Sequence, residues 1–427
     1  MLSILFGLLG LACLLGIALL FSRARGAVDW RLVATGVALQ LLFALFVLRT
    51  PFGAAMFGAL SDGFVALLGF TRQGAQFIFG DMARIDKFGF IFAFQVLPTI
   101  IFFASFMSVL YHLGVMQAVV RAMAWVITKV MRVSGAETLS VCANAFIGQT
   151  EAPLVVKPYV ATMTRSELLT LMVGGMATIA GGVLGAYVQM LGGADPAAQA
   201  EFAKHLITAS IMAAPATLVI AKILMPETED PLTRGHVRIE VEKTTANVID
   251  AAAFGAADGL KLALNVGAML LAFIALIALI NAPLTWIGEV TGLAAWLGRP
   301  TDLAALLGLV LAPIAWVIGV PWADATTVGG LIGTKVVLNE FVAYAQLSEI
   351  IQGKVDGVSL GPQGTLIATY ALCGFANFSS IAIQIGGIGG LAPERRHDLA
   401  RLGLLAVLGG SLATLMTATI AGVISQL

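Results

Sequence analysis

Long runs of apolar residues separated by short polar segments form the dominant pattern along the chain. An α-helix rises about 1.5 Å per residue, so about 20 consecutive apolar residues are needed to cross a bilayer. The runs predict membrane-spanning helices over residues 2–21, 32–48, 88–113, 167–191, 205–225, 266–288, 365–391 and 402–425. The first run could instead be a signal peptide, but it lacks a basic leading segment, which favours a spanning helix.

Three other stretches, 53–70, 116–132 and 249–264, repeat apolar residues at helical spacing and place charged residues off the apolar stripe. The stripe of the first consists of Phe57, Leu60, Phe64 and Leu67. This pattern predicts amphipathic helices that lie along the membrane interface or on other helices. A short buried helix would produce much the same pattern.

Two further apolar stretches, 134–157 and 303–345, are interrupted by glycine, proline and polar residues. The first contains Glu151 and the second contains Glu340. Irregular backbone at membrane depth is tolerated only where protein or a water-filled cavity surrounds it. Both stretches are therefore predicted to be re-entrant hairpins, which enter and leave the membrane on the same side.

The same order of elements occurs twice along the chain. Each copy begins with a broken hairpin that contains a glutamate, continues with a span rich in small residues, and ends with a final span. Paired discontinuous segments in inverted repeats are typical of the midplane substrate site of a transporter. The fold class predicted is an all-α polytopic membrane protein with eight spans, two hairpins and an inverted repeat. Its domains are a scaffold over 1–133, a first transport repeat over 134–225, a cytoplasmic linker with an interfacial helix and a sixth, scaffold span over 226–302, and a second transport repeat over 303–427.

Composition supports a membrane location. Of the 427 residues, 59% are hydrophobic and 11% are charged, whereas a soluble domain carries roughly 25% charged residues. The 24 basic and 24 acidic residues balance. The sequence lacks the basic patch with interleaved aromatic residues that would predict nucleic-acid binding. Cys13, Cys142 and Cys373 are far apart in sequence and form neither a metal-binding nor a disulfide pattern.

The distribution of lysine and arginine predicts the orientation. With eight spans, both termini lie on one side, and most basic residues gather in the loops of the other side. Because positive residues favour the cytoplasm, both termini are expected to face outward. The segment 49–87 runs against this assignment, since it carries four basic residues on the outer side.

Glu151 and Glu340 are the sharpest candidates for function. A carboxylate at bilayer depth is unfavourable by several kcal/mol unless it is paired or solvated. Each could instead cap the end of a half-helix, where backbone N–H groups favour an anion. An intramembrane enzyme using the two as acid and base is a further alternative, but no Gly-x-Ser-x-Gly or His-Glu-x-x-His motif is present. An ion channel would not need two different carboxylate-bearing hairpins.

Polar residues also interrupt two of the predicted spans. One interruption is Thr178, which lies between two glycine pairs, and the other extends from Cys373 to Ser380. Unwound backbone at these points would expose carbonyl groups able to hold a cation. Close helix packing is an equally good explanation for the glycines themselves.

Three motifs together resemble the bacterial concentrative nucleoside transporters. They are GQTEAPL at 148–154, NEFVAY at 339–344 and CGFANFSSIAI at 373–383, and their order and spacing match over nearly the whole chain. The resemblance implies a homotrimer in the bacterial cytoplasmic membrane, with two re-entrant hairpins and an elevator-like transport domain. It also implies sodium-coupled nucleoside symport without an organic cofactor, while proton coupling remains open.

The resemblance further implies particular site residues. Those expected at the base are Gly148, Gln149, Thr150, Glu151 and Val183. Those expected at the ribose are Glu340, Asn377, Ser380 and Phe375. The sodium ion is expected at the side chains of Asn144 and Thr178 and the carbonyl groups of Ile147 and Ile179. The preference between pyrimidine and purine nucleosides is not predicted.

Overall fold

The computed structural model describes residues 2–234, 245–297, 300–355 and 357–427, and the regular elements among these residues are helices, with no β-strand. Within them, eight stretches are long and apolar enough to cross a membrane. The helices concerned are α1 (Leu2–Leu20), α2 (Trp30–Arg49), α3 (Pro51–Phe79), α5 (Phe92–His112), α9 (Arg165–Ala177) with α10 (Gly181–Gly192), α11 (Pro196–Leu224), α12 (Val248–Thr291) and α19 (Arg396–Ser425). The predicted all-α class is confirmed.

The eight are not the same set as those predicted. Helix α3 is long enough to span, although its sequence suggested a shorter interfacial helix over 53–70. Its buried face is also only partly the predicted stripe, because Phe57 is buried whereas Leu60 is 51% exposed. The predicted span 365–391 is instead divided into α17 (Pro362–Ala371) and α18 (Phe378–Leu391).

The predicted boundary between residues 264 and 266 is wrong, because it falls inside helix α12. The stretches 249–264 and 266–288 were expected to be an interfacial helix and a span, but they form one helix of 44 residues. Small residues continue along one face, and Gly255 and Gly259 lie directly against the backbone of α5, where a Cβ atom would come within 2.6–2.8 Å of its neighbours. The expected linker before α12 includes residues 235–244, which lie outside the described residues.

The second broken stretch also differs from its prediction. Residues 303–345 were expected to form one hairpin, but they contain α14 (Leu303–Val317) and α15 (Trp322–Val337), bent by 117°, and the start of α16 (Glu340–Ile351). The break beside Glu340 therefore separates α15 from α16. The first broken stretch consists of α7 (Gly135–Asn144), a loop, and the short helices η3 (Ala152–Val156) and α8 (Lys157–Val160).

The remaining helices connect these elements. The stretch 116–132 forms α6 (Val115–Met131), an amphipathic helix as predicted, with Val120, Ala124 and Ile127 on its buried face. The short helices are η1 (Arg25–Ala27), η2 (Gly80–Ala83), α4 (Ile85–Phe88), α13 (Leu293–Leu297) and η4 (Pro393–Arg395).

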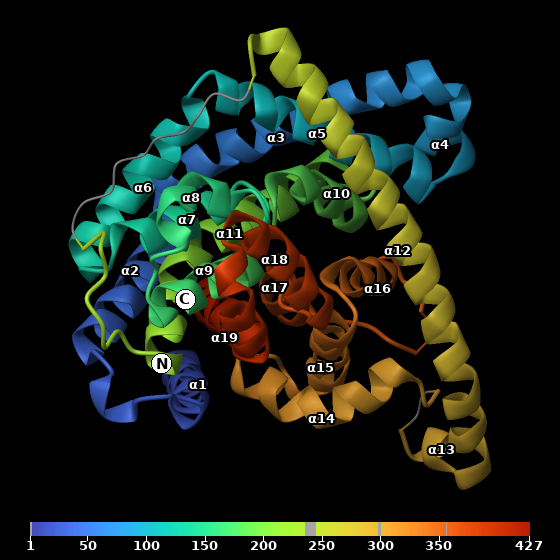
Figure 1. Ribbon diagram of the computed structural model, residues 1–427. Coiled ribbons are helices and arrows are strands. Elements are labelled where there is room, and N and C mark those ends of the chain that lie inside the picture. Colours follow the sequence, from blue (N-terminus) through green and yellow to red (C-terminus); the bar gives the residue numbers. More distant parts are fainter. Residues whose placement is uncertain (1, 235–244, 298–299, 356) are drawn as a thin grey trace.

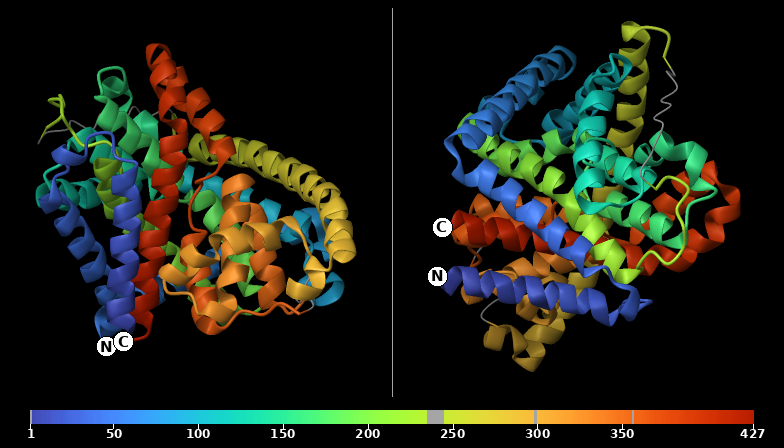
Figure 2. Two further views of the ribbon diagram at one scale, coloured as in Figure 1. Left: turned by 90° about the horizontal axis from the view of Figure 1, so that it is seen from below. Right: turned by 90° about the vertical axis from the view of Figure 1, so that its left-hand side faces the viewer.

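Burial separates an inner group of helices from an outer group. In the most apolar 18-residue window, 89% of α11 is buried, and the corresponding values are 83% for α9 with α10 and 78% for α19. For α12 the value is 17%, and this helix runs along one side of the bundle (Figure 1). Both termini lie close together at one end, where α1 packs beside α19 (Figure 2).

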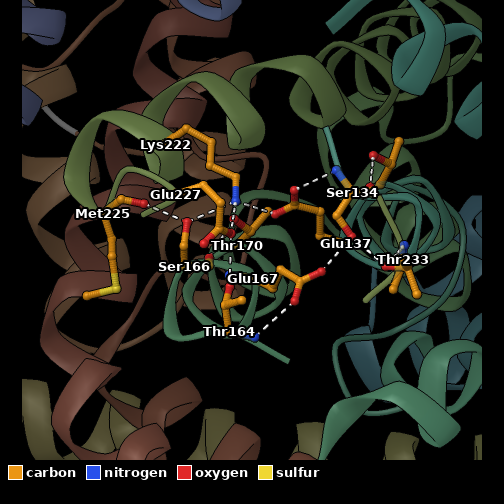
Figure 3. A network of polar contacts seen from close by, with 12 residues as sticks. Ser134, Glu137, Thr164, Ser166, Glu167, Thr170, Lys222, Met225, Glu227 and Thr233 are labelled. Carbon is orange, nitrogen blue, oxygen red and sulfur yellow. Dashed lines mark hydrogen bonds and ion pairs between the residues drawn. The ribbon is translucent and has the colours of Figure 1, made fainter. Parts of the chain in front are cut away.

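A buried polar network holds the helix ends on one side of the inner group (Figure 3). Glu137 and Glu167 each close a capping box at the start of α7 and α9. Lys222, near the end of α11, lies 2.8 Å from Glu137 Oε2 and donates to Ser166 Oγ at 2.9 Å. Since each carboxylate accepts from a helix N-terminus, the network fixes the broken first hairpin against α9 and α11.

Candidate functional site

The breaks in the two divided helices lie against each other at the centre of the inner group. The break between α9 and α10 contains Thr178, and its backbone oxygen accepts from the N–H of Phe375 in the break between α17 and α18 (3.3 Å). Gly374 permits this approach, because a Cβ atom there would lie 2.7 Å from the backbone oxygen of Met176. Unpaired peptide groups of both helices are therefore concentrated in one place.

The loop between α7 and η3, residues 145–151, packs on this crossing. The N–H of Gly181, the first residue of α10, donates to the backbone oxygen of Phe146 in this loop at 2.9 Å. Gly148 then turns the chain, and its oxygen accepts from the N–H of Ala152 at 3.0 Å. A Cβ atom at Gly148 would meet the carboxylate of Glu151 as it now lies, so a larger residue at this turn would require the Glu151 side chain to move.

The break between α15 and α16 places Glu340 in the interior. Asn339 caps α16 by accepting from the N–H of Val342, and Glu340 is the first residue of that helix. Its side chain is 4% exposed. Glu340 Oε1 accepts from the Tyr187 hydroxyl at 3.0 Å, and Oε2 accepts from Asn377 Nδ2 at 3.1 Å. Both carboxylate oxygens are thus oriented by side chains from other helices.

A second set of contacts joins the expected base and ribose residues. Gln149 Nε2 donates to Ser380 Oγ at 3.2 Å, which links the first hairpin tip to α18. Asn377 caps α18, and its Oδ1 accepts from the N–H of Ser380 at 2.9 Å. The structure therefore brings Gln149, Ser380, Asn377 and Glu340 into one continuous group.

The other expected base residues lie beside this group or outside it. The Thr150 hydroxyl donates to Glu151 Oε1 at 2.9 Å, and the carboxylate of Glu151 is exposed. Val183 is buried in the first turn of α10, and Phe375, which is expected at the ribose, is half-buried in the break before α18. None of these four positions contradicts the expected role. Glu151 differs from Glu340 in having no bonded partner from a distant helix within the described residues.

Two of the expected sodium residues, Asn144 and Thr178, lie where the end of α7 meets the break between α9 and α10. Asn144 is buried, its Nδ2 donates to the backbone oxygen of Ser140 at 3.1 Å, and its Oδ1 has no hydrogen-bond partner in the described part of the chain. Asn144 packs against the turn of α9 that ends at Thr178, whose hydroxyl donates to the oxygen of Gly174 at 3.0 Å. A buried acceptor without a donor suits a hard cation that binds oxygen.

Three buried polar residues near the site were not predicted. Tyr187 follows Val183 by one helical turn, and Gln384 follows Ser380 by one turn, so helical spacing from an expected residue could have found both. Lys335 of α15 donates to the oxygen of Ala371 at 2.9 Å and to Thr414 Oγ1 at 3.0 Å. The rarity of charged residues in membrane helices could have identified it.

A bundle of apolar helices in which polar side chains gather at crossed helix breaks is the architecture of a membrane transporter. Comparison with known families agrees with this class. The profile described as "Na+ dependent nucleoside transporter C-terminus" matches residues 205–422, the corresponding N-terminal profile matches 9–82, and "Nucleoside recognition" matches 93–194. The chain belongs to the sodium-dependent nucleoside transporter family, whose members are membrane transporters and not enzymes.

Individual relatives agree over most of the chain. An uncharacterized transporter of Haemophilus influenzae is 45% identical over 98% of this chain and 97% of its own length. Sodium/nucleoside cotransporter 1 of Mus musculus is 41% identical over 94% of this chain and 61% of its own length. Among solved structures, CNTnw in an inward-facing substrate-bound state has a TM-score of 0.87, at 44% identity over 99% of this chain and 98% of that one. A doubly substituted form of CNTnw in an outward-facing state has a TM-score of 0.90, at 43% identity over 100% and 99%.

Proposed function

We propose that this protein carries nucleosides into the cell together with sodium, by alternating access of a site between its two hairpin tips. The observation that supports this most directly is the environment of Glu340. Its carboxylate is buried in the interior of an apolar bundle, yet it is held by Tyr187 and Asn377 at the crossing of the helix breaks. A buried carboxylate in a membrane protein indicates a functional site.

The ribose is the ligand group that fits Glu340 best. Vicinal hydroxyls can each donate to one carboxylate oxygen, and hydrogen bonds to an ionised acceptor are stronger than neutral ones. Asn377 and Ser380, one helical turn apart at the start of α18, would hold the same sugar. Phe375 would pack beside it.

The base would then lie toward the first hairpin tip. Gln149 is joined to Ser380 through its amide nitrogen, so the ribose and base ends are continuous. Gly148, Thr150 and Glu151 supply the remaining surface of that tip, and Val183 supplies an apolar contact. Because nucleosides are neutral, recognition there would depend on directional hydrogen bonds.

Sodium would bind between Asn144 and Thr178, with the backbone oxygens of Ile147 and Ile179 as further ligands. The unpaired, buried Oδ1 of Asn144 supports this assignment. The ion would link the first hairpin to the break in α9 and α10, directly behind the base-binding residues. Occupancy of this position would therefore order Gln149 and its neighbours before the nucleoside binds.

The moving part would be the two repeats, 134–225 and 303–427, which act as an elevator against a scaffold of 1–133 and the span in 226–302. In both segments a broken stretch precedes a divided helix and a long final helix, α11 or α19. The highly exposed α12 would contact lipid and the other copies of a homotrimer in the cytoplasmic membrane. Both termini, which lie at one end of the molecule, would face outward.

Uptake of radiolabelled uridine and adenosine into proteoliposomes tests the proposal. Accumulation above the external concentration, driven by an inward sodium gradient, is the expected result. Accumulation driven equally well by a proton gradient without sodium would replace sodium by protons as the coupling ion. Equilibration without accumulation under either gradient would contradict coupled transport.

Alternating access has a separate test. A single cysteine at Thr150, in a background that replaces Cys13, Cys142 and Cys373, would be labelled by a membrane-impermeant thiol reagent from each face of oriented vesicles. A ligand shifts a conformational equilibrium only by its differential affinity for the two states. Sodium is expected to favour labelling from outside, and sodium with nucleoside to permit labelling from inside. Equal labelling from both faces, unaffected by either ligand, would indicate a pore.

A further inference from the structure

Gln384 of α18 is a fully buried amide that contacts an expected base-binding residue. Its exposure is 0%. Its Nε2 donates to Gln149 Oε1 at 3.1 Å and to the backbone oxygen of Met172 in α9 at 3.0 Å. Gln149 in turn donates through Nε2 to Ser380 Oγ at 3.2 Å. Met172, Gln384, Gln149 and Ser380 therefore form a continuous chain of hydrogen bonds.

The backbone oxygen at one end determines the direction of the whole chain. A peptide carbonyl group can only accept, so the amide nitrogen of Gln384 must face Met172. The same nitrogen reaches Gln149, and the atom that faces it must therefore be the oxygen of the Gln149 amide. The Gln149 nitrogen is then directed to Ser380. Since the Ser380 hydroxyl accepts there, its own proton is left to donate to another group.

Packing around the two amides is consistent with this arrangement. Gly175 of α9 lies against both side chains, and a Cβ atom there would lie 2.6 Å from Gln384 Nε2 and 2.9 Å from the Cβ of Gln149. The space for the paired amides therefore depends on the absence of a side chain at this position. Gln384 itself lies behind Gln149 and is not among the residues expected to contact the ligand.

We propose that Gln384 is a positioning residue that sets the hydrogen-bond polarity of the base-binding end of the site. This inference rests on the proposed function. By holding the oxygen of Gln149 away from the ligand, Gln384 leaves a second N–H of Gln149 to face the base, while the O–H of Ser380 is left to donate to the ribose. The site then selects nucleosides whose base turns a hydrogen-bond acceptor, such as a carbonyl oxygen, toward the Gln149 N–H.

The test compares two ligands that exchange donor and acceptor groups on one edge of the base. Uridine carries a carbonyl and a ring N–H where cytidine carries an amino group and a ring acceptor. The ratio of their dissociation constants would be measured by calorimetry on the purified protein in sodium. In Gln384→Met, Gln149 is free to rotate its amide, and the ratio is expected to shift by roughly three- to tenfold toward the base that offers a donor at the contacted position.

Gln40 provides a closely matched control. It is also 0% exposed, and its Nε2 also donates to a backbone oxygen (Met212, 2.8 Å) and to a second oxygen (Thr417 Oγ1, 3.2 Å). The Oε1 atoms of Gln40 and Gln384 both lack a hydrogen-bond partner in the described part of the chain. It joins α2 to α11 and α19, away from the hairpin tips. Gln40→Met removes the same number of contacts and is expected to leave the ratio within about twofold of the wild type.

A double-substitution cycle separates positioning from a general structural effect. In a Gln149→Ala background, Gln384→Met is expected to cause no further change in the ratio. An independent shift in that background, or equal shifts in Gln384→Met and Gln40→Met, would overturn the role of Gln384. Gly175→Ala displaces the same two amides and serves as the second variant if Gln384→Met fails to fold. An independent shift of Gly175→Ala in the Gln149→Ala background, or a shift equal to that of Gln40→Met, would likewise overturn the role of Gln384. A wild-type protein that binds neither nucleoside would overturn the proposed function together with this inference.

Discussion

The two broken stretches, 134–157 and 303–345, each contain a glutamate, yet they surround the two carboxylates differently. Glu340 is buried, and its oxygens accept from Tyr187 and Asn377, which are 153 and 37 residues away in sequence. Glu151 is exposed, and its bonded partner is the adjacent Thr150. One carboxylate is held by the tertiary structure, whereas the other is held by its own loop.

The local backbone explains this difference. Glu340 follows its capping residue Asn339 directly and begins α16, so its side chain is directed by a regular helix toward α10 and α18. Glu151 follows the turn at Gly148, in a loop that precedes a short 3-10 helix. Under the proposed function, Glu340 would therefore be preorganised for the ligand, whereas Glu151 would have to be oriented on binding, at an entropic cost.

The largest effect is expected for Glu340→Gln. An amide brings a donor where both oxygens now accept, so it would face either Tyr187 or Asn377 unfavourably. A hydrogen bond to a charged group contributes ~1.5–3 kcal/mol, and affinity for every nucleoside should fall by roughly tenfold to a hundredfold. Uptake in proteoliposomes and calorimetric binding measure this loss. The control is Glu349→Gln, an exposed position on the same helix, and wild-type uptake by Glu340→Gln would remove Glu340 from the site.

A smaller and base-dependent effect is expected for Glu151→Gln. The exposed carboxylate loses its charge without breaking a buried network, so affinity should fall by roughly three- to thirtyfold. The loss should differ between uridine and adenosine, because this tip is proposed to meet the base. Competition measurements give the ranking of nucleosides. An equal loss of affinity for all nucleosides would mean that Glu151, like Glu340, does not contact the base. The proposed difference in role between the two glutamates would then be wrong.

The substitutions Asn144→Ala and Thr178→Ala test the sodium site proposed between α7 and the break in α9 and α10. Each removes one oxygen from a hard cation that binds oxygen, and the sodium concentration for half-maximal uptake should rise by roughly tenfold. The ranking of nucleosides should persist. Thr170→Ala is a matched control, because Thr170 is a buried threonine of α9 whose hydroxyl also donates to the carbonyl oxygen four residues earlier. A changed ranking with an unchanged sodium requirement would show that the ion binds elsewhere.

The smallest effect is expected for Tyr187→Phe. The ring keeps its contacts with Phe341 and Tyr344, whose centroids lie at 4.7 and 4.5 Å. Glu340 loses one of two donors, and affinity should fall by roughly twofold to tenfold. The combined variant Tyr187→Phe with Glu340→Gln should bind no more weakly than Glu340→Gln alone. Additive losses in binding would show that the tyrosine hydroxyl contacts the ligand independently.

Much of the fold and part of the site could be predicted from the sequence. The apolar runs located the long helices, and the motifs around Gln149, Glu340 and Asn377 identified residues that the structure brings together. Tyr187 and Gln384 were missed because their roles depend on contacts with distant segments. The predicted boundary within α12 was also wrong. The polar residues of 249–264 suggested a separate interfacial helix, but small residues there pack against α5 and the helix continues without a break.

Helical periodicity and the scarcity of charge are local properties, so the sequence by itself determined the helical class, the membrane character and the positions of the two glutamates. The different surroundings of those glutamates are not local properties. They depend on which helix break crosses which, and on the side chains that the crossing brings within hydrogen-bond distance. Only the tertiary structure decided that Glu340 would be buried between Tyr187 and Asn377, while Glu151 would remain exposed beside Thr150.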